Sequence, residues 1–270
     1  MPDSKSEPIL DCHAHVFPPQ VAAKAVASIG AFYDLPMGGG GTAQDLVRVS
    51  RKAGITHSII FSTATRLEQV AAINRFMVIC QKSEPSFTAF GTLHPAMSES
   101  ETAAVLDQIA AAGLKGVKLH PDFQNIEADS PFVIHATRLM AGRLILLLHA
   151  GDNRHDYSQP DRIRRLAEAC PDTVIIAAHL GGWSQWQEAA DKLADIDRLL
   201  VDTSSTLKFI DSEEAAGLIR RFGIRRVLFG TDYPMWDPAA EMARFNQLPL
   251  NAAERRAILW ENGNRLLRLV

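Results

Sequence analysis

Short apolar segments alternate with segments of helical periodicity along almost the whole chain. Each apolar segment has the length of a strand and ends in a polar or glycine-containing stretch that leads to the next helix. Eight such strand and helix pairs with right-handed crossovers close naturally as a single (β/α)8 TIM barrel of the α/β class. The predicted strands cover residues 8–15, 55–62, 86–93, 115–120, 144–149, 173–179, 199–202 and 225–230.

Capping signals place the predicted helices between these strands. Thr42 with Asp45 resembles a capping box, and Ser130-Pro131 is a cap followed by proline at the first helical position. The connection after His15 is longer, and its glycines at residues 38–41 are expected to form a flexible hinge for a lid. The predicted helices cover residues 42–54, 67–84, 99–112, 132–141, 160–169, 185–194 and 213–222, and two more begin near Asp237 and Asn251.

Residues 1–270 are expected to form one domain, because no Pro/Ser-rich or charged linker divides the chain. The alternative is an open doubly wound sheet, which also alternates strand and helix. That fold would want a Gly-rich nucleotide turn after a strand, and the sequence contains no GxGxxG. The composition, 47% hydrophobic and 22% charged, is ordinary for a soluble protein, and a net charge of −3 gives no reason to expect nucleic acid.

Cysteine usage and the amino terminus indicate a cytoplasmic protein. Cys12, Cys80 and Cys170 are odd in number and widely spaced, so no disulfide framework is expected. The amino terminus MPDSKSEP lacks the apolar stretch of a signal peptide, and no apolar run approaches the length of a membrane span. The expected partner is therefore a small-molecule substrate, and the sequence leaves open whether the chain forms a homo-oligomer.

Groups that can bind a metal ion gather at the ends of the predicted strands. In an extended chain, alternation puts His13 and His15 side by side, with Asp11 deeper on the same face. All strand ends of a barrel lie on one face, which carries the active site, and burying many imidazoles there without a metal or charge partner would be costly. The other groups at strand ends are His94, Lys118, His120, His149, His179 and Asp232.

Alternation also points His149 and Asp232 inward, so they can join His13 and His15 around one ion. Nitrogen ligands with a carboxylate and an open position suit catalytic Zn²⁺, and Mn²⁺, Fe²⁺ or Co²⁺ can use the same donors. Cys12 is turned away from His13 by the same alternation and is expected to be a packed side chain rather than a ligand.

Other polar and aromatic residues fall in loops on the same side. Arg66, Arg154, His155 and Lys208 can hold a substrate carboxylate, although most loop cations are simply solvated. Trp236 and Phe123 follow strand ends, where they can wall a pocket or pack the rim of the barrel.

The ordered motifs DCHAH, GVKLHP, LLLHAGD, AAHLGG and FGTDYP resemble the amidohydrolase superfamily. Within it they are similar to the amidohydrolase-related branch that includes aminocarboxymuconate-semialdehyde decarboxylase and pyrone-dicarboxylate lactonase. The resemblance implies that Asp232 is the strand-eight ligand and proton handler, and that His179 activates or orients the water on the metal. The other metal ligands that it implies are His13, His15 and His149.

The expected function is a metal-dependent hydrolase that attacks a small ester, lactone or amide-like bond with metal-activated water. A metal lowers the pKa of its water from near 16 to about 7, and Asp232 can take the proton. One alternative is a non-oxidative decarboxylase of a small aromatic or unsaturated carboxylic acid. Another is a barrel that binds metal or ligand without turnover, against which the open coordination position and Asp232 argue.

The number of ions depends on Lys118 and His120. In binuclear relatives of the superfamily a carbamylated lysine or a glutamate from strand four bridges two ions, which favours two metals here. Alternation places His120 at the outer end of the strand and Lys118 a layer deeper, and the branch that the chain resembles generally works with one metal. We therefore expect a single ion, an unmodified Lys118, and His120 either facing the substrate or supporting the metal ligands.

Overall fold

Eight strands form one sheet in the computed structural model, which describes residues 7–269. The strands follow one another in chain order, and each pairs in parallel with the next. They are β1 (Leu10–His15), β2 (His57–Phe61), β3 (Phe87–Gly91), β4 (Gly116–Leu119), β5 (Ile145–Leu148), β6 (Ile175–Ala177), β7 (Leu199–Asp202) and β8 (Val227–Leu228).

Backbone hydrogen bonds between β1 and the segment after β8 close this sheet. The amide of Cys12 donates to the carbonyl of Phe229 at 2.8 Å, and the amide of Asp232 donates to the carbonyl of His13 at 2.8 Å. The predicted (β/α)8 TIM barrel is therefore confirmed.

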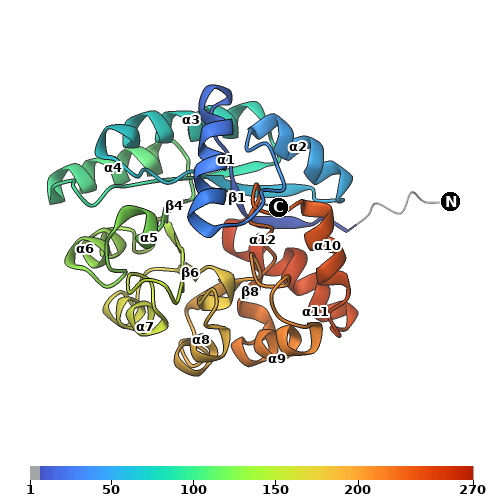
Figure 1. The fold of residues 1–270 in the computed structure, drawn as a ribbon. Helices are drawn as coiled ribbons and strands as arrows, with labels where there is room; N and C mark the ends of the chain where they lie inside the picture. Colours follow the sequence, from blue (N-terminus) through green and yellow to red (C-terminus); the bar gives the residue numbers. More distant parts are fainter. Residues whose placement is uncertain (1–6, 270) are drawn as a thin grey trace.

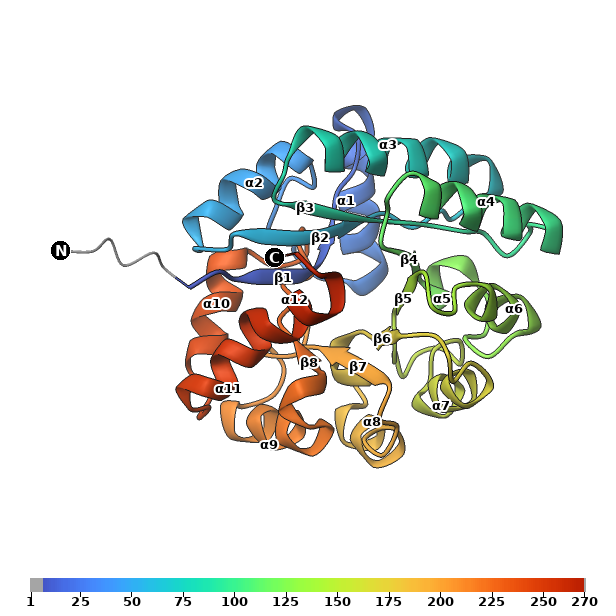
Figure 2. The same cartoon turned by 180° about the vertical axis from the view of Figure 1, so that it is seen from behind.

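Helices surround the barrel and cover both of its ends. In Figure 1, α1 lies in front of the barrel opening, whereas α12 lies at the opposite end, in the foreground of Figure 2. No helix of residues 7–269 is long and apolar enough to cross a bilayer. The helices are α1 (Pro19–Tyr33), α2 (Ala43–Lys52), α3 (Val70–Ser83), α4 (Glu99–Ala111), α5 (Pro121–Gln124), α6 (Pro131–Leu139), α7 (Pro160–Ala169), α8 (Trp186–Leu193), α9 (Ser212–Phe222), α10 (Pro238–Asn246), α11 (Ala252–Arg256) and α12 (Asn262–Leu267).

The expected caps begin their helices, but several boundaries differ from the prediction. The Thr42 side chain accepts from the amide of Asp45, and the Ser130 side chain caps α6. The helices α1 and α5 occupy segments expected to be a partly helical connection and a polar loop. β8 begins later than expected because a 3-10 turn, Ile224–Arg226, directly precedes it. Other 3-10 turns form at Leu67–Gln69 and His179–Gly181, and a π-helical turn, Ala257–Glu261, joins α11 to α12.

Two apolar clusters make up the core because side chains of a strand alternate between its faces. Ile59, Leu147 and their equivalents fill the interior of the barrel, where Leu267 of α12 joins them and closes its amino-terminal end. Ile60 and Leu146 belong to the larger cluster between the strands and the surrounding helices. Both faces of each strand are thus buried, which explains the nearly continuous apolar runs in the sequence.

β1 departs from regular alternation. Its pairing with β2 slips between Asp11 and Ala14, where three residue steps on β1 match two on β2. Cys12 therefore packs in the interior cluster although His13 also faces the inside of the barrel. The expected placement of Asp11 below His13 is wrong: its carboxylate accepts from the amides of His13 and Thr231, at 3.0 and 2.9 Å. Cys12, Cys80 and Cys170 are buried and unpaired in the structure.

The glycines at residues 38–41 pack tightly against the loop that follows β8. The amide of Gly38 donates to the carbonyl of Pro234 at 2.9 Å, and the amide of Gly41 donates to the hydroxyl of Tyr233 at 2.8 Å. A Cβ atom at Gly39 would lie 2.3 Å from the ring of Tyr233. These glycines allow close approach between two loops, in place of the flexible hinge that was expected. Residues 1–6 of the polar amino terminus lie outside the described residues.

Candidate active site

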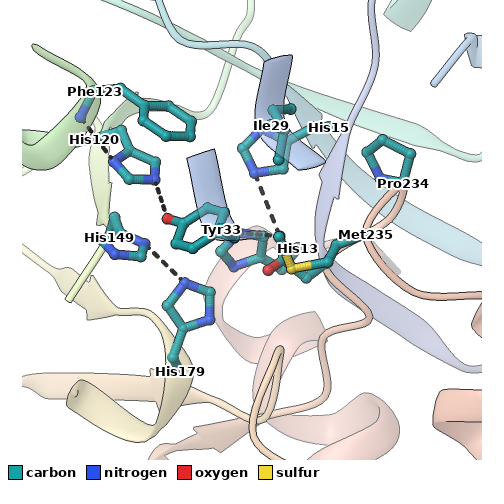
Figure 3. A pocket seen from close by; sticks show the side chains of 11 residues that line it. His13, His15, Ile29, Tyr33, His120, Phe123, His149, His179, Pro234 and Met235 are labelled. Carbon is teal, nitrogen blue, oxygen red and sulfur yellow. Dashed lines mark hydrogen bonds and ion pairs between the residues drawn. The ribbon is translucent and has the colours of Figure 1, made fainter. Parts of the chain in front are cut away.

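The carboxyl ends of the strands surround a small cavity, which α1 covers with Ile29 and Tyr33. Figure 3 shows imidazole rings from several strands meeting there, beside apolar side chains from α1 and from the loop after β8. The lining residues are His13, His15, Ile29, Tyr33, His120, Phe123, His149, His179, Asp232, Pro234 and Met235.

Three groups that can bind a metal ion lie close together in the cavity: the side chains of His13, His15 and Asp232. Nε2 of His13 and Nε2 of His15 lie 3.4 and 3.5 Å from the same oxygen, Oδ1 of Asp232. Donor atoms of His13, His179 and Asp232 also lie within 4.8 Å of one another. Two imidazoles and a carboxylate at such distances are a donor set that suits a divalent metal ion.

The charges of these groups favour a cation as well. Burial lowers the pKa of His13 to about 4 and also lowers the pKa of His15, so both rings are neutral and keep a lone pair at neutral pH. Burial opposes ionisation of Asp232, but the neighbouring histidines outweigh it and hold the pKa of this carboxyl well below its usual value. The group therefore offers two neutral nitrogen donors and one negative charge.

Asp202, at the end of β7, fixes the orientation of His13. Its buried Oδ2 atom lies 2.9 Å from Nδ1 of His13, and because a carboxylate can only accept, Nδ1 carries the proton. The lone pair of His13 is thus on Nε2, which faces Asp232. The other oxygen of Asp202 accepts from the amides of His179 and Ser204 at 3.1 and 3.0 Å. A carboxylate on the far nitrogen is the usual support of a metal-binding histidine.

His179 links His13 to His149. Its Nε2 atom lies 3.0 Å from Nδ1 of His149, and its Nδ1 atom lies 3.0 Å from the carbonyl oxygen of Ser204. The structure groups His149 with His120 and Asp122, whose donor atoms lie within 4.8 Å of one another. His149 therefore lines the cavity, and its hydrogen-bond partner there is His179.

Both residues predicted to be catalytic adopt a left-handed backbone conformation. The φ angles are 59° for His179 and 58° for Asp232. Such angles are costly for residues other than glycine, and they concentrate at functional sites where the surrounding structure enforces them. In this barrel they occur where the chain leaves β6 and β8, and both side chains line the cavity. Figure 3 shows the ring of His179 there.

His120 is held between two parallel rings and contacts a tyrosine from α1. The ring centroids lie 3.7 Å from Phe123 and 3.9 Å from His149, with interplanar angles of 7° and 9°. Nδ1 of His120 accepts from the amide of Phe123 at 3.3 Å, and Nε2 lies 3.1 Å from the hydroxyl of Tyr33. The predicted position of His120 facing the cavity agrees with this arrangement.

Lys118 lies in the barrel interior, outside the lining of the cavity. Its Nζ atom is 3.3 Å from Nε2 of His13 and 5.0 Å from the centre of the Phe61 ring. Burial lowers the pKa of Lys118 to about 8. This lysine contacts a candidate metal ligand from below, a layer deeper than His120.

A sequence model of the amidohydrolase family matches residues 10–269. The chain belongs to the amidohydrolase family. The amidohydrolase has no match among the curated proteins compared.

Solved structures share the fold of this amidohydrolase at low sequence identity. An uncharacterised TIM-barrel protein from Bordetella bronchiseptica has a TM-score of 0.81 and 19% identity, covering 97% of this chain and 98% of that chain. A 5-carboxyvanillate decarboxylase from Sphingomonas paucimobilis has a TM-score of 0.74 and 14% identity, covering 98% and 100%. A dihydroxybenzoic acid decarboxylase from Polaromonas, with bound manganese and 2-nitroresorcinol, has a TM-score of 0.74 and 15% identity, covering 98% of each chain.

Four residues considered as substrate-binding or supporting groups of the site lie outside the cavity lining: Arg66, His94, Arg154 and Trp236. Arg66 is exposed and forms an ion pair with Glu68 at 3.2 Å, and His94 accepts from a backbone amide of its own loop. Trp236 donates to the hydroxyl of Ser205 at 2.8 Å, and that hydroxyl donates to Asp232. Trp236 thus supports Asp232 indirectly.

Arg154 holds α1 over the cavity of the amidohydrolase. Its guanidinium pairs with the buried Asp152 at 2.7 Å and donates to the carbonyl of Phe32 at 2.9 Å. It also lies over the rings of Phe32, Tyr33 and Trp183, at 5.0, 5.3 and 5.6 Å. The guanidinium of Arg154, which was considered as a binding group for a substrate carboxylate, is engaged in these contacts within the protein.

The sequence prediction missed Asp202, Asp122 and Tyr33. Asp202 ends β7 on the face where the other strand ends carry ligands, so its position in the alternating pattern was a usable signal. Asp122 directly follows the GVKLHP motif. Tyr33 lies in a connection without a recognisable motif, and nothing in the sequence indicated its role.

Proposed function

We propose that this amidohydrolase is a divalent-metal-dependent decarboxylase of a small aromatic or unsaturated carboxylic acid. The observation that carries the proposal is the mixed lining of the cavity, where imidazoles around Asp232 lie beside apolar side chains. Phe123 and Met235 are among these apolar side chains, which can pack against the flat face of an unsaturated ring. The names of the structural relatives, decarboxylases of carboxyvanillate and dihydroxybenzoate, support this choice.

His13, His15 and Asp232 would hold the metal ion, with His149 as the fourth ligand that the family resemblance implies. The bound ion would act as a Lewis acid that draws electron density from the substrate carboxylate. Zn²⁺ suits these donors, and Mn²⁺, which a structural relative binds, is the first alternative to test. The unpaired cysteines support the proposed cytoplasmic location, and the continuous barrel supports one domain.

His179 is the proposed proton donor. When the bond between the substrate carbon and its carboxylate breaks, carbon dioxide leaves and the electron pair stays on the carbon, which must then take a proton. Nε2 of His179 lies at the cavity, while Nδ1 is held on the carbonyl of Ser204. Because Nδ1 donates to this carbonyl, transfer from Nε2 requires the protonated imidazolium ring, which then returns to the neutral form with its proton on Nδ1. Apolar side chains of the lining keep water away from the same carbon.

Hydrolysis of a small ester or lactone is the second candidate. The observation that favours it is the ionised Asp232 beside His13 and His15, because a carboxylate at this position can accept a proton from an attacking water molecule. Both candidates use the same ligands, and they differ in the product that is released.

A product assay on metal-loaded enzyme separates the two candidates. Hydroxybenzoates and carboxylated phenols would be tested for release of carbon dioxide, and aryl esters and lactones for release of acid. We expect the metal-loaded enzyme to release carbon dioxide from at least one acid. This activity should disappear when the metal is removed. Release of acid from a lactone, without carbon dioxide from any acid, would favour hydrolysis. A fully metal-loaded enzyme that turns over neither class would contradict both.

Two histidine variants test the proposed roles within this assay. His13→Ala should lower the metal content measured by elemental analysis, whereas His179→Ala should keep the metal and lose turnover. His57→Ala is a matched control, because His57 begins β2 at the opposite end of the barrel and packs against Trp260. Turnover by His179→Ala at the wild-type rate would remove its proposed role.

A further inference from the structure

Tyr33 brings a hydroxyl group from α1 into the cavity. Among the described lining residues it has the one side-chain hydroxyl, and the lining contains neither lysine nor arginine. The hydroxyl oxygen lies 3.1 Å from Nε2 of His120. The direction of this hydrogen bond decides what Tyr33 can offer to a substrate.

The backbone fixes that direction. The amide of Phe123 can only donate, and it lies 3.3 Å from Nδ1 of His120, so Nδ1 carries the lone pair. An imidazole whose Nδ1 carries the lone pair has its one proton on Nε2. Nε2 therefore donates to the oxygen of Tyr33. The hydroxyl hydrogen of Tyr33 is left to point elsewhere, and the cavity is the space beside it (Figure 3).

Both partners are held in place. The His120 ring is sandwiched between Phe123 and His149, with centroids 3.7 and 3.9 Å away, which prevents it from turning over. The Tyr33 ring lies 5.3 Å from the Arg154 guanidinium and packs edge-on against Trp183 at 5.3 Å. The donor is thus oriented before any substrate arrives, so little entropy is lost when it binds.

We propose that Tyr33 determines specificity by donating its hydroxyl hydrogen to an uncharged oxygen substituent of the substrate. This inference rests on the proposed function and narrows it. The substrate is a monocarboxylic acid that carries a hydroxyl, ether or carbonyl oxygen opposite its carboxylate-binding side. A second carboxylate on the ring is disfavoured, because the described lining offers it neutral donors and no lysine or arginine, and a buried unpaired charge is costly.

Calorimetric binding of four probes to the metal-loaded enzyme tests the proposal. Benzoate serves as the reference, 3-hydroxybenzoate and 4-hydroxybenzoate add an oxygen, and isophthalate adds a second carboxylate. Wild-type enzyme should bind one hydroxybenzoate about 3- to 10-fold more tightly than benzoate, the range expected for one neutral hydrogen bond. Tyr33→Phe should lose that preference and keep its affinity for benzoate within about twofold.

Two further variants guard the interpretation. Tyr157→Phe removes a tyrosine hydroxyl outside the cavity and should retain the preference. His120→Phe keeps a ring between Phe123 and His149 but no longer fixes the Tyr33 hydroxyl, so the preference should shrink. His120→Phe carries the test if Tyr33→Phe does not fold by circular dichroism.

The outcomes separate this inference from the proposed function. If Tyr33→Phe, or His120→Phe in its place, keeps the wild-type preference, the role of Tyr33 is refuted and the proposed function stands. If isophthalate binds more tightly than either hydroxybenzoate, the monocarboxylate class is refuted. If the wild-type enzyme binds none of the four acids, both the inference and the proposed function fail.

Discussion

Replacing Asp202 by asparagine should weaken metal binding while leaving the barrel folded. One carboxylate oxygen of Asp202 accepts from Nδ1 of His13 at 2.9 Å, and the other accepts from the amides of His179 and Ser204. An asparagine that keeps its oxygen on the two amides presents its NH₂ group to His13. Nδ1 must then accept, which moves the ring proton to Nε2, the atom that faces Asp232.

The reverse orientation of the asparagine is less favourable. It would place the NH₂ group against the amides of His179 and Ser204 and lose both of these hydrogen bonds, at about 1 kcal/mol each. The first orientation should therefore prevail, and the metal would have to displace a proton from His13. Loss of a carboxylate that supports a metal-binding histidine typically costs about 10- to 100-fold in affinity, or roughly 1.4 to 2.8 kcal/mol.

Competition with a chelator of known affinity would measure this change. Asp211→Asn is the control, because Asp211 caps α9 by accepting from the amide of Glu214 at 2.8 Å and asparagine caps equally well. Circular dichroism should show the same fold for both variants. If Asp202→Asn bound metal within threefold of the wild-type protein, the reasoning about the proton on His13 would be refuted.

Three further predictions concern stability. Gly39→Ala should lower the free energy of unfolding by about 1–3 kcal/mol because its Cβ would overlap the ring of Tyr233, whereas Gly217→Ala, in an open helical position, should raise it by up to about 1 kcal/mol in urea titrations. Burial raises the pKa of Glu241 from 4.5 to about 7. The protonated side chain therefore contributes fully to the free energy of unfolding below pH 4.5, and this contribution is lost as the pH rises through 7. The stability of the wild-type protein relative to Glu241→Gln should therefore fall between pH 5 and pH 8, and a constant difference would contradict this. Arg154→Met should speed proteolysis within α1, because the end of this helix loses its hydrogen bond to Arg154. Arg256→Met is the control, because the ion pair of Arg256 with Glu261 is exposed. Equal rates of proteolysis in the two variants would contradict the role of Arg154 in holding α1.

The fold was predictable because its signal is local and repeated. Each strand of the barrel is an apolar run between helices with clear caps, so every segment indicates the same architecture. α1 was predicted only as a partly helical connection. It covers the mouth of the barrel and Ala22 is its one fully buried residue, so its sequence shows little helical periodicity. The register slip in β1 was not predicted, because the alternation rule assumes a regular strand.

The candidate site was predictable only as far as strand ends indicate it. The five residues at strand ends that were predicted as ligands or catalytic groups all line the cavity: His13, His15, His149, His179 and Asp232. Their supporting partners come from distant positions: Asp202 contacts His13 across 189 residues, and Tyr33 contacts His120 across 87. Such pairs depend on how the loops pack, which no local pattern specifies.

The junction between β1 and the segment after β8 joins the two ends of the chain. Asp11 accepts from the amide and the hydroxyl of Thr231, 220 residues away, and the proposed ligands His13 and Asp232 lie at the same junction. An ion held there would act as a reversible cross-link, and a cross-link of that span restricts the unfolded chain by about 5 kcal/mol in the chain-entropy treatment. Removal of the ion would remove this cross-link. The barrel would then open first between its first and last strands, while the other strand pairs were still intact.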